Sequence, residues 1–272
     1  MKIIYPKVEI LTEINSTEIL KMLESIGRTC YKSEDKITES SSKDFIAGII
    51  KRGHEAILEH FNISVRFTVD RGISHEIVRH RVASYAQEST RYCNYSKDKF
   101  NNNITFIDIS NGLKFDSKCK NLSKSLLDSI YNEWLEANLD AEKHYMNLLE
   151  LGATPQIARS VLNNSTKTEL CMTANIREWR HFLKLRCAKN AHPQMREVAI
   201  ELLEKFKRSL PELFGDIETD KDDLDIFYKE TETKKLSDDE QRFNIWCAKK
   251  GIEQISFEDY ITYLNETEDE VR

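Results

Sequence analysis

The sequence predicts an α+β protein, and three segments carry that prediction. Phe61 to Val69 alternates apolar and polar residues without a break, which is the pattern of a β-strand with one buried face. A long amphipathic segment from Leu122 to Leu151 and a shorter one over 175–186 repeat apolar residues at helical spacing. At 272 residues the chain can bury a substantial core, as one large domain or as one domain with an appendage.

The other elements follow from local signals in chain order. Before residue 90 we expect a strand over 7–11, a helix over 16–26, a helix from Ser41 or Ser42 to Gly53, and a helix from Ile73 to about Ser84. After residue 100 we expect a strand over 104–107, a helix that starts at Pro155, a strand over 168–174, and a helix from Pro193 to about Lys207. The chain therefore mixes strands and helices throughout its first 215 residues.

Charge is unevenly distributed along the chain. The net charge is −6, yet residues 216–272 hold 18 Asp/Glu against 8 Lys/Arg, a net −10, so the rest carries +4. We predict a main domain over 1–215 and an acidic extension over 216–272, with helices opened by the capping box at Ser237 and by Ser256. A mildly basic body suits small anionic ligands, whereas a nucleic-acid-binding protein usually has a strongly basic face.

Several classes of protein are disfavoured. No run approaches the about 18 apolar residues of a membrane helix, and the start lacks the apolar core of a signal peptide, so we expect no membrane association and a cytoplasmic location. The six cysteines form no CxxC pair, which favours reduced thiols over disulfides or zinc. The His-Glu pairs at His54 and His75 lack a second histidine four residues after the first, so we predict no metal.

The segment 79–92 contains the most chemical information. It begins Arg79-His80-Arg81 and includes Arg91 near its end, with hydroxyl and amide side chains between. Guanidinium groups form planar forks that bind phosphates and carboxylates. On the expected helix, Arg79 and Arg81 would point roughly 200° apart, so we expect them to serve two ligands, or one ligand and a neighbouring subunit.

This segment resembles the signature of flavin-dependent thymidylate synthases, in which Arg-His-Arg is followed, after seven residues, by Ser. Arg79-His80-Arg81 and Ser89 have that spacing, and the resemblance extends over roughly 5–215. The run Gly53-His54-Glu55 to Glu59-His60 is similar to a second family segment. Arg159, Asn175, Arg177 and Arg186 match a third and a fourth. Ala86-Gln87 stands where many members carry Asn-Glu, and His181 stands where Asn is frequent.

The resemblance implies a mixed or antiparallel sheet with flanking helices, and a methyltransferase that converts dUMP to dTMP. Methylenetetrahydrofolate would donate the carbon and NADPH would reduce FAD, in a homotetramer with shared active sites. The family's dUMP contacts fall on Glu76, Ile77, Val78, Arg79, Gln87, Glu88, Ser89, Thr90, Arg91, Arg159 and Arg186. Its FAD contacts fall on Ala56, Arg79, His80, Arg81, Gln87, Asn175, Ile176, Arg177 and His181.

Within that set, Arg186 is the expected catalytic residue. Uracil C5 is a poor nucleophile, and a permanent cation beside the ring would favour its ionised form. Ser89 has no patterned base beside it and is expected to donate or accept a substrate hydrogen bond.

Two alternatives remain open from the residues alone. One is a nucleotide- or RNA-binding protein without turnover, in which Tyr85, Tyr92 and Tyr95 would stack on bases. The other keeps the fold and makes hydroxymethyl-dUMP instead of dTMP.

Overall fold

The computed structural model describes residues 1–97, 100 and 102–231, and it divides the chain into two compact units. The first unit is Met1–Asp223 and the second starts at Leu224. Residues 216–223 belong to the first unit, where Asp216 pairs with Arg180 and Asp223 pairs with Arg196. The helices expected after Ser237 and Ser256 lie outside the described residues, so a separate helical extension stays a prediction.

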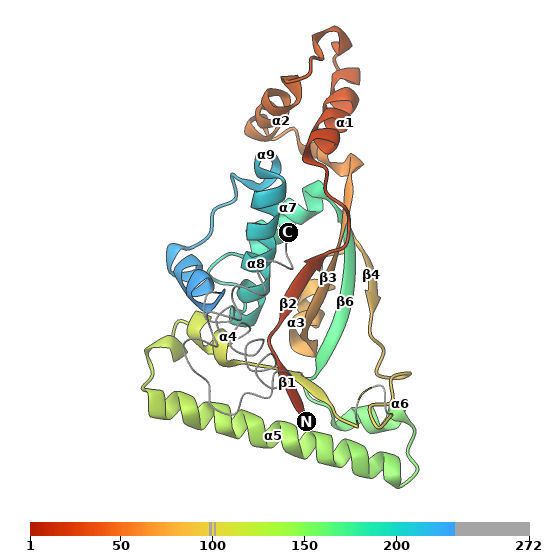
Figure 1. The fold of residues 1–272 in the computed structure, drawn as a ribbon, viewed down its shortest axis with the longest axis vertical. Coiled ribbons are helices and arrows are strands. Elements are labelled where there is room, and N and C mark those ends of the chain that lie inside the picture. Colours follow the sequence, from red (N-terminus) through yellow and green to blue (C-terminus); the bar gives the residue numbers. More distant parts are fainter. Residues whose placement is uncertain (98–99, 101, 232–272) are drawn as a thin grey trace, which may run out of the picture. The chain divides into compact units, whose positions relative to one another are not determined.

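A four-stranded antiparallel sheet forms the centre of the first unit (Figure 1). Its order is β2 (Lys7–Ile10), β3 (Asn62–Asp70), β6 (Lys167–Asn175) and β4 (Ser84–Gln87). A parallel pair, β1 (Lys2–Ile4) with β5 (Thr105–Ile107), makes a second small sheet. The predicted α+β class and the mixed, mainly antiparallel sheet are therefore confirmed. Strands β1 and β4 were not predicted.

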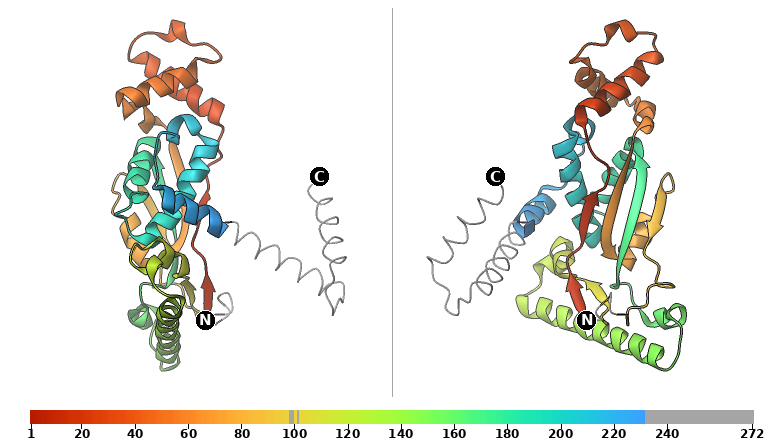
Figure 2. Two further views of the ribbon diagram at one scale, coloured as in Figure 1. Left: turned by 90° about the vertical axis from the view of Figure 1, so that its left-hand side faces the viewer. Right: turned by 45° about the vertical axis from the view of Figure 1, so that its right-hand side comes forward.

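The two long central strands, β3 and β6, run antiparallel, with Asn62 opposite Asn175 and Asp70 opposite Lys167. Their alternating pattern places Ile63, Val65 and Phe67 at zero exposure on one face. Helices α7 (Ile176–Arg186) and α8 (Pro193–Ser209) cover that face (Figures 1 and 2). The core between them is rich in aromatic contacts, which include Trp179 with Phe67, Phe182 and Phe206.

The predicted helices form close to their expected bounds. They are α1 (Ser16–Thr29), α2 (Ser41–Arg52), α5 (Lys124–Glu150), α7 and α8. The exception is the helix predicted to start at Pro155 and to continue through Arg159 and Leu162, which is only the short α6 (Pro155–Ala158), followed by the 3-10 helix η5 (Arg159–Val161). Asn15 caps α1, and Gly53 ends α2 in the left-handed conformation at φ 69°. The short helices α4 (Ser110–Phe115) and α9 (Pro211–Phe214) were not predicted. Within the described residues, no helix combines the length and apolar character that crossing a membrane requires.

The helix predicted from Ile73 to Ser84 is wrong in its second half. Helix α3 (Arg71–Ile77) begins at the N-cap Asp70 and ends at Ile77. The Tyr85 hydroxyl is shared between the carbonyl oxygens of Ile77 and His80, at 3.0 and 2.5 Å, and residues 84–87 pair with β6. These tertiary hydrogen bonds replace the helical ones. The motif residues 79–81 therefore lie in a turn, and the expected 200° separation of its two arginines does not apply.

Candidate functional site

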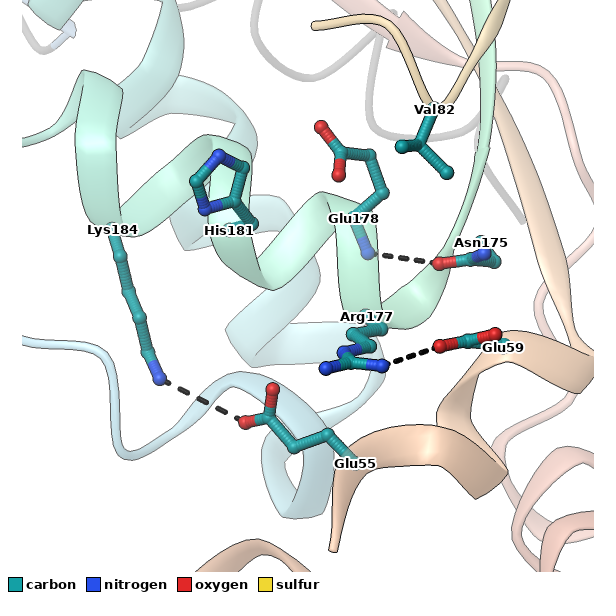
Figure 3. Close-up of a pocket in the computed structure, with 8 residues that line it drawn as sticks. All are labelled: Glu55, Glu59, Val82, Asn175, Arg177, Glu178, His181 and Lys184. Carbon is teal, nitrogen blue, oxygen red and sulfur yellow. Dashed lines mark hydrogen bonds and ion pairs between the residues drawn. The ribbon is translucent and has the colours of Figure 1, made fainter. Parts of the chain in front are cut away.

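An open pocket of about 560 Å³ lies between α7 and the 3-10 helix η2 (Glu55–His60) (Figure 3). Two ion pairs cross it: Arg177 Nη1 lies 2.5 Å from Glu59 Oε1, and Lys184 Nζ lies 3.9 Å from Glu55 Oε1. The pocket lining consists of Glu55, Glu59, Val82, Asn175, Arg177, Glu178, His181 and Lys184.

The end of β6 explains why these side chains converge. Asn175 is the last residue of the strand and the N-cap of α7, where its Oδ1 accepts from the Glu178 backbone N–H at 2.9 Å. Arg177, His181 and Lys184 then fall at i, i+4 and i+7 on one side of the helix. Three residues expected to bind FAD (Asn175, Arg177 and His181) therefore line one pocket. Of the other expected contacts, Ile176 is fully buried and Ala56 is exposed on η2.

A second row of side chains follows the opposite edge of the same helix. Glu178, Phe182 and Arg186 are spaced i, i+4 and i+8, and the buried His80 ring lies against Phe182 at 4.8 Å between ring centroids. The His80 ring contacts Glu178, one helical turn before Phe182, and Arg186, one helical turn after it. Its Nδ1 lies 3.0 Å from Glu178 Oε1, and its Nε2 accepts from Arg186 Nε at 3.1 Å.

These contacts define the charge state of His80. Burial lowers the pKa of His80 below its ordinary value, and the Arg186 charge lowers it further, while the hydrogen bond to Glu178 acts in the opposite direction. Because Nε2 accepts from Arg186, a neutral ring must carry its proton on Nδ1 and donate it to Glu178. His181 also approaches this cluster, and its ligand atom lies within 4.8 Å of those of His80 and Glu178.

Arg186 and Glu76, both expected at the substrate, form an ion pair. Arg186 Nη1 lies 2.8 Å from Glu76 Oε2, and Nη2 donates to the Glu76 carbonyl oxygen at 3.0 Å. The side chains are 15% and 33% exposed, so the pair is accessible from one side. Glu76 also lines a second cavity of about 280 Å³, beside Asp70 and Gln194. Burial raises the pKa of Asp70, although its Oδ1 accepts from the Ile73 backbone N–H.

Residues 87–91 hold their places through hydrogen bonds to β6 and its neighbours. Gln87 Nε2 donates to Ser74 Oγ at 2.9 Å. Glu88 accepts from Lys167 Nζ at 3.0 Å and from the Tyr95 hydroxyl at 3.1 Å. Both carboxylate oxygens of Glu88 are thus engaged by protein groups.

Arg159 joins the other end of this run. Its Nη1 donates to the Thr90 hydroxyl at 3.2 Å, and Thr90 is 4% exposed. Ser89 Oγ accepts from the Arg91 backbone N–H at 3.3 Å. The structure therefore brings Arg159 into contact with Thr90, in the segment that also contains Ser89 and Arg91. Within the residues that the structure describes, no hydrogen bond or ion pair joins this group directly to Arg186.

Three arginines of the motif extend from the surface. Arg79, Arg81 and Arg91 are exposed, and none forms an ion pair within the described part of the chain. Arg91 lies over the Tyr92 ring, with its guanidinium carbon 5.4 Å from the centroid. Two neighbouring residues that were expected to contact dUMP differ in exposure: Val78 is 37% exposed, whereas Ile77 is fully buried.

The stacking surface required by the binding-protein alternative is not formed. The Tyr85 hydroxyl is bound to backbone carbonyls, and burial raises its pKa to about 12. Tyr95 is 5% exposed and donates to Glu88. Of the three tyrosines, Tyr92, at 78% exposure, is the one presented to solvent.

Sequence reasoning missed Glu178 as part of the site, and although helical spacing puts Lys184 on the same face as Arg177 and His181, Lys184 was not assigned to the site. Glu178 has a recognisable signal, because it precedes Arg186 by two helical turns with an apolar residue midway. Nothing in the sequence alone indicates that His80 would lie between Glu178 and Arg186.

Comparison with known proteins places this site in context. The sequence model of a family described as thymidylate synthase complementing protein matches residues 14–212. The flavin-dependent thymidylate synthases of Corynebacterium efficiens and Corynebacterium glutamicum are each 32% identical over 218 residues. These alignments cover 77% and 78% of this chain and 83% and 84% of the relatives. A Mycobacterium avium protein of the same name is 31% identical over 204 residues, covering 72% of this chain and 79% of its own length.

A solved structure shares the fold. The UMP/dUMP methylase PolB from Streptomyces cacaoi, crystallised with 5-Br dUMP, superimposes with a TM-score of 0.66 at 23% identity. The match covers 79% of this chain and 96% of that chain. At this identity the likeness supports the architecture alone.

Proposed function

The chain belongs to the flavin-dependent thymidylate synthase family, and on that premise we propose that it methylates dUMP to dTMP. Methylenetetrahydrofolate is the proposed carbon donor and NADPH the proposed reductant of FAD. The observation that supports this most strongly is that Arg186 lies beside Glu76 and His80, because the resemblance to the family implies a cation beside the uracil at the Arg186 position.

The large pocket fits part of a flavin nucleotide. Its walls supply hydrogen-bonding groups, and Val82, at 65% exposure, offers apolar surface to a flat ring. Its own cations are balanced by Glu55 and Glu59, so the diphosphate requires further positive charge, which the exposed Arg79 and Arg81 can supply. FAD, once bound and reduced, supplies the hydride that completes the methyl group.

Arg186 is proposed to polarise the uracil. The Nε–H of Arg186 donates to His80, and its two Nη groups donate to Glu76. The Nη groups are therefore the donors that would meet the uracil oxygens. A guanidinium remains charged at any pH of interest and spans two acceptors. A donor of this kind strengthens its interaction as negative charge develops on the ring.

The phosphate of dUMP is proposed to meet the group formed by Ser89, Thr90, Arg91 and Arg159. Backbone and hydroxyl donors lie there beside two guanidinium groups, which is the chemistry that recognises a phosphate. Glu88 and Gln87 bind protein groups, so we propose that these two residues hold the segment 87–91 in its conformation.

We propose a homotetramer in which neighbouring subunits complete each site. Large apolar side chains are exposed at Val82 (65%), Tyr92 (78%), Leu151 (85%) and Ile157 (61%), and β4 lies at an edge of the sheet. Light scattering should give four chains per particle, and dilution should release flavin as subunits separate. A monomer that keeps flavin at full occupancy would contradict shared sites.

A cytoplasmic location is also proposed. The five cysteines within the described residues are free thiols, as expected in a reducing compartment. Fractionation of cells that express the natural protein would test this location.

A product assay tests the function itself. The purified protein should be yellow, and with dUMP, methylenetetrahydrofolate, NADPH and FAD it should form dTMP, identified by mass. Hydroxymethyl-dUMP as the product would contradict the proposal in favour of the alternative that keeps the fold. A colourless protein that binds dUMP without turnover would contradict it in favour of a binding protein.

A further inference from the structure

We propose that Glu178 is a positioning residue that acts through His80 to hold Arg186 in a fixed orientation. Glu178 accepts at His80 Nδ1 (3.0 Å), and His80 accepts at Nε2 from Arg186 Nε (3.1 Å). Arg186 in turn pairs with Glu76 at 2.8 Å. The four side chains make a continuous chain of hydrogen bonds that starts at one cavity and ends at another.

The helix makes this arrangement rigid. Glu178 and Arg186 stand two turns apart on α7, and Phe182, fully buried between them, supports the His80 ring. His80 is 5% exposed, and Tyr85 holds its carbonyl oxygen at 2.5 Å. The imidazole therefore has little freedom to turn, and its two nitrogens face the two ends of the row.

The two hydrogen bonds depend on one proton. If the proton sits on Nδ1, Glu178 accepts it and Nε2 is free to accept from Arg186. If the proton sits on Nε2, it points at the Arg186 N–H, and both hydrogen bonds are lost. A carboxylate at Nδ1 favours the first tautomer and increases the acceptor strength of Nε2, as a carboxylate does behind a histidine in many sites. Glu178 thus determines how well His80 anchors Arg186.

The consequence for Arg186 is directional. With Nε anchored, the plane of the guanidinium is set and both Nη groups face Glu76. Without the anchor, the long side chain regains rotational freedom, and the donors lose their preorganised direction. Positioning is a property of the protein alone, whereas its effect on methylation rests on the proposed function.

NMR of the protein without ligands tests the positioning directly. In protein labelled with ¹⁵N in histidine and arginine, His80 should show a protonated Nδ1 and an unprotonated Nε2, with its signals assigned by their loss in His80→Gln. In Glu178→Ala, the Arg186 Nε–H should exchange with solvent on the order of tenfold faster. Glu178→Gln keeps an acceptor oxygen and should preserve the tautomer. This near-isosteric variant keeps the test valid if the alanine variant folds poorly.

Glu59→Gln is the matched control, because it removes a carboxylate from the same pocket that pairs with Arg177 instead of His80. It should leave the His80 and Arg186 signals unchanged. A proton on Nε2 in the wild-type protein, or equal Arg186 exchange in wild type and Glu178→Ala, would overturn the proposal.

Kinetics separate this proposal from the proposed function. Glu178→Ala should lower kcat for dTMP formation on the order of tenfold, with Glu178→Gln closer to wild type. If the wild-type protein makes no dTMP while the NMR result holds, the function is wrong and the positioning stands. If dTMP forms at the wild-type rate in Glu178→Ala, Glu178 does not position a group that the reaction needs.

Discussion

Replacing Arg186 is the sharpest test of how this site works. Arg186→Ala removes three hydrogen bonds: 2.8 Å to Glu76 Oε2, 3.0 Å to the Glu76 carbonyl and 3.1 Å to His80 Nε2. It also removes the one cation in that set of contacts, which at 15% exposure is largely screened from water. Loss of a preorganised donor to developing negative charge typically costs on the order of 10²–10³ in rate, about 3–4 kcal/mol.

Two further substitutions separate charge from geometry. Arg186→Lys keeps the charge, but an ammonium group cannot donate to His80 and also span two acceptors. It should therefore restore little of the rate of dTMP formation. Ser89→Ala removes an uncharged hydrogen bond worth roughly 0.5–1.5 kcal/mol and should lower activity only modestly.

The assay is single-turnover oxidation of reduced flavin by dUMP and methylenetetrahydrofolate. NADPH oxidation by bound FAD should survive each of these substitutions, because that half-reaction does not involve the uracil, and it therefore reports an intact flavin site. If Ser89→Ala abolished turnover while Arg186→Ala barely changed it, the electrostatic assignment would be refuted and a serine nucleophile would return to consideration.

Three further predictions concern stability and the chain end. Arg180, 1% exposed, pairs with the 44% exposed Asp216 at 2.6 Å and donates to the buried Leu213 carbonyl oxygen, so Arg180→Met should lower the free energy of unfolding by about 1–3 kcal/mol in urea titrations. The Arg180 hydrogen bond holds the pKa of Asp216 below its ordinary value. The stabilisation is therefore complete above the unfolded pKa of about 3.9 and disappears as pH falls through the lower folded pKa, so Asp216→Asn should match wild type only in strong acid. A chain ending at residue 223 should keep flavin binding and activity. A chain ending at residue 215 should be less stable, because it lacks Asp216. Equal melting temperatures for the two truncated chains would count against the role of the Arg180–Asp216 pair.

The sequence by itself determined most of the local structure. The unbroken alternation of Phe61 to Val69 predicted the central strand, because a period of two leaves one face to be buried. Gly53 marked the end of α2, since it adopts a positive φ at little cost. Helical spacing also grouped Arg177, His181 and Lys184 on one side of α7, where they line the same pocket. Motif spacing alone was enough to identify the family.

Only the tertiary structure decided how the motif is presented. The run from Ile73 to Ser84 has helical character, yet α3 ends at Ile77, because the Tyr85 hydroxyl and the pairing of β4 with β6 provide alternative hydrogen bonds. The β6 residues that pair with β4 are distant in sequence, and local propensity cannot account for that pairing.

The same limit applies to the site's central contacts. His80 and Arg186 stand 106 residues apart, and His80 and Glu178 stand 98 apart. Each residue is recognisable in the sequence as polar and functional. That one imidazole links a carboxylate and a guanidinium follows from the packing of the motif turn on Phe182, because a buried ring has one orientation that satisfies both of its nitrogens.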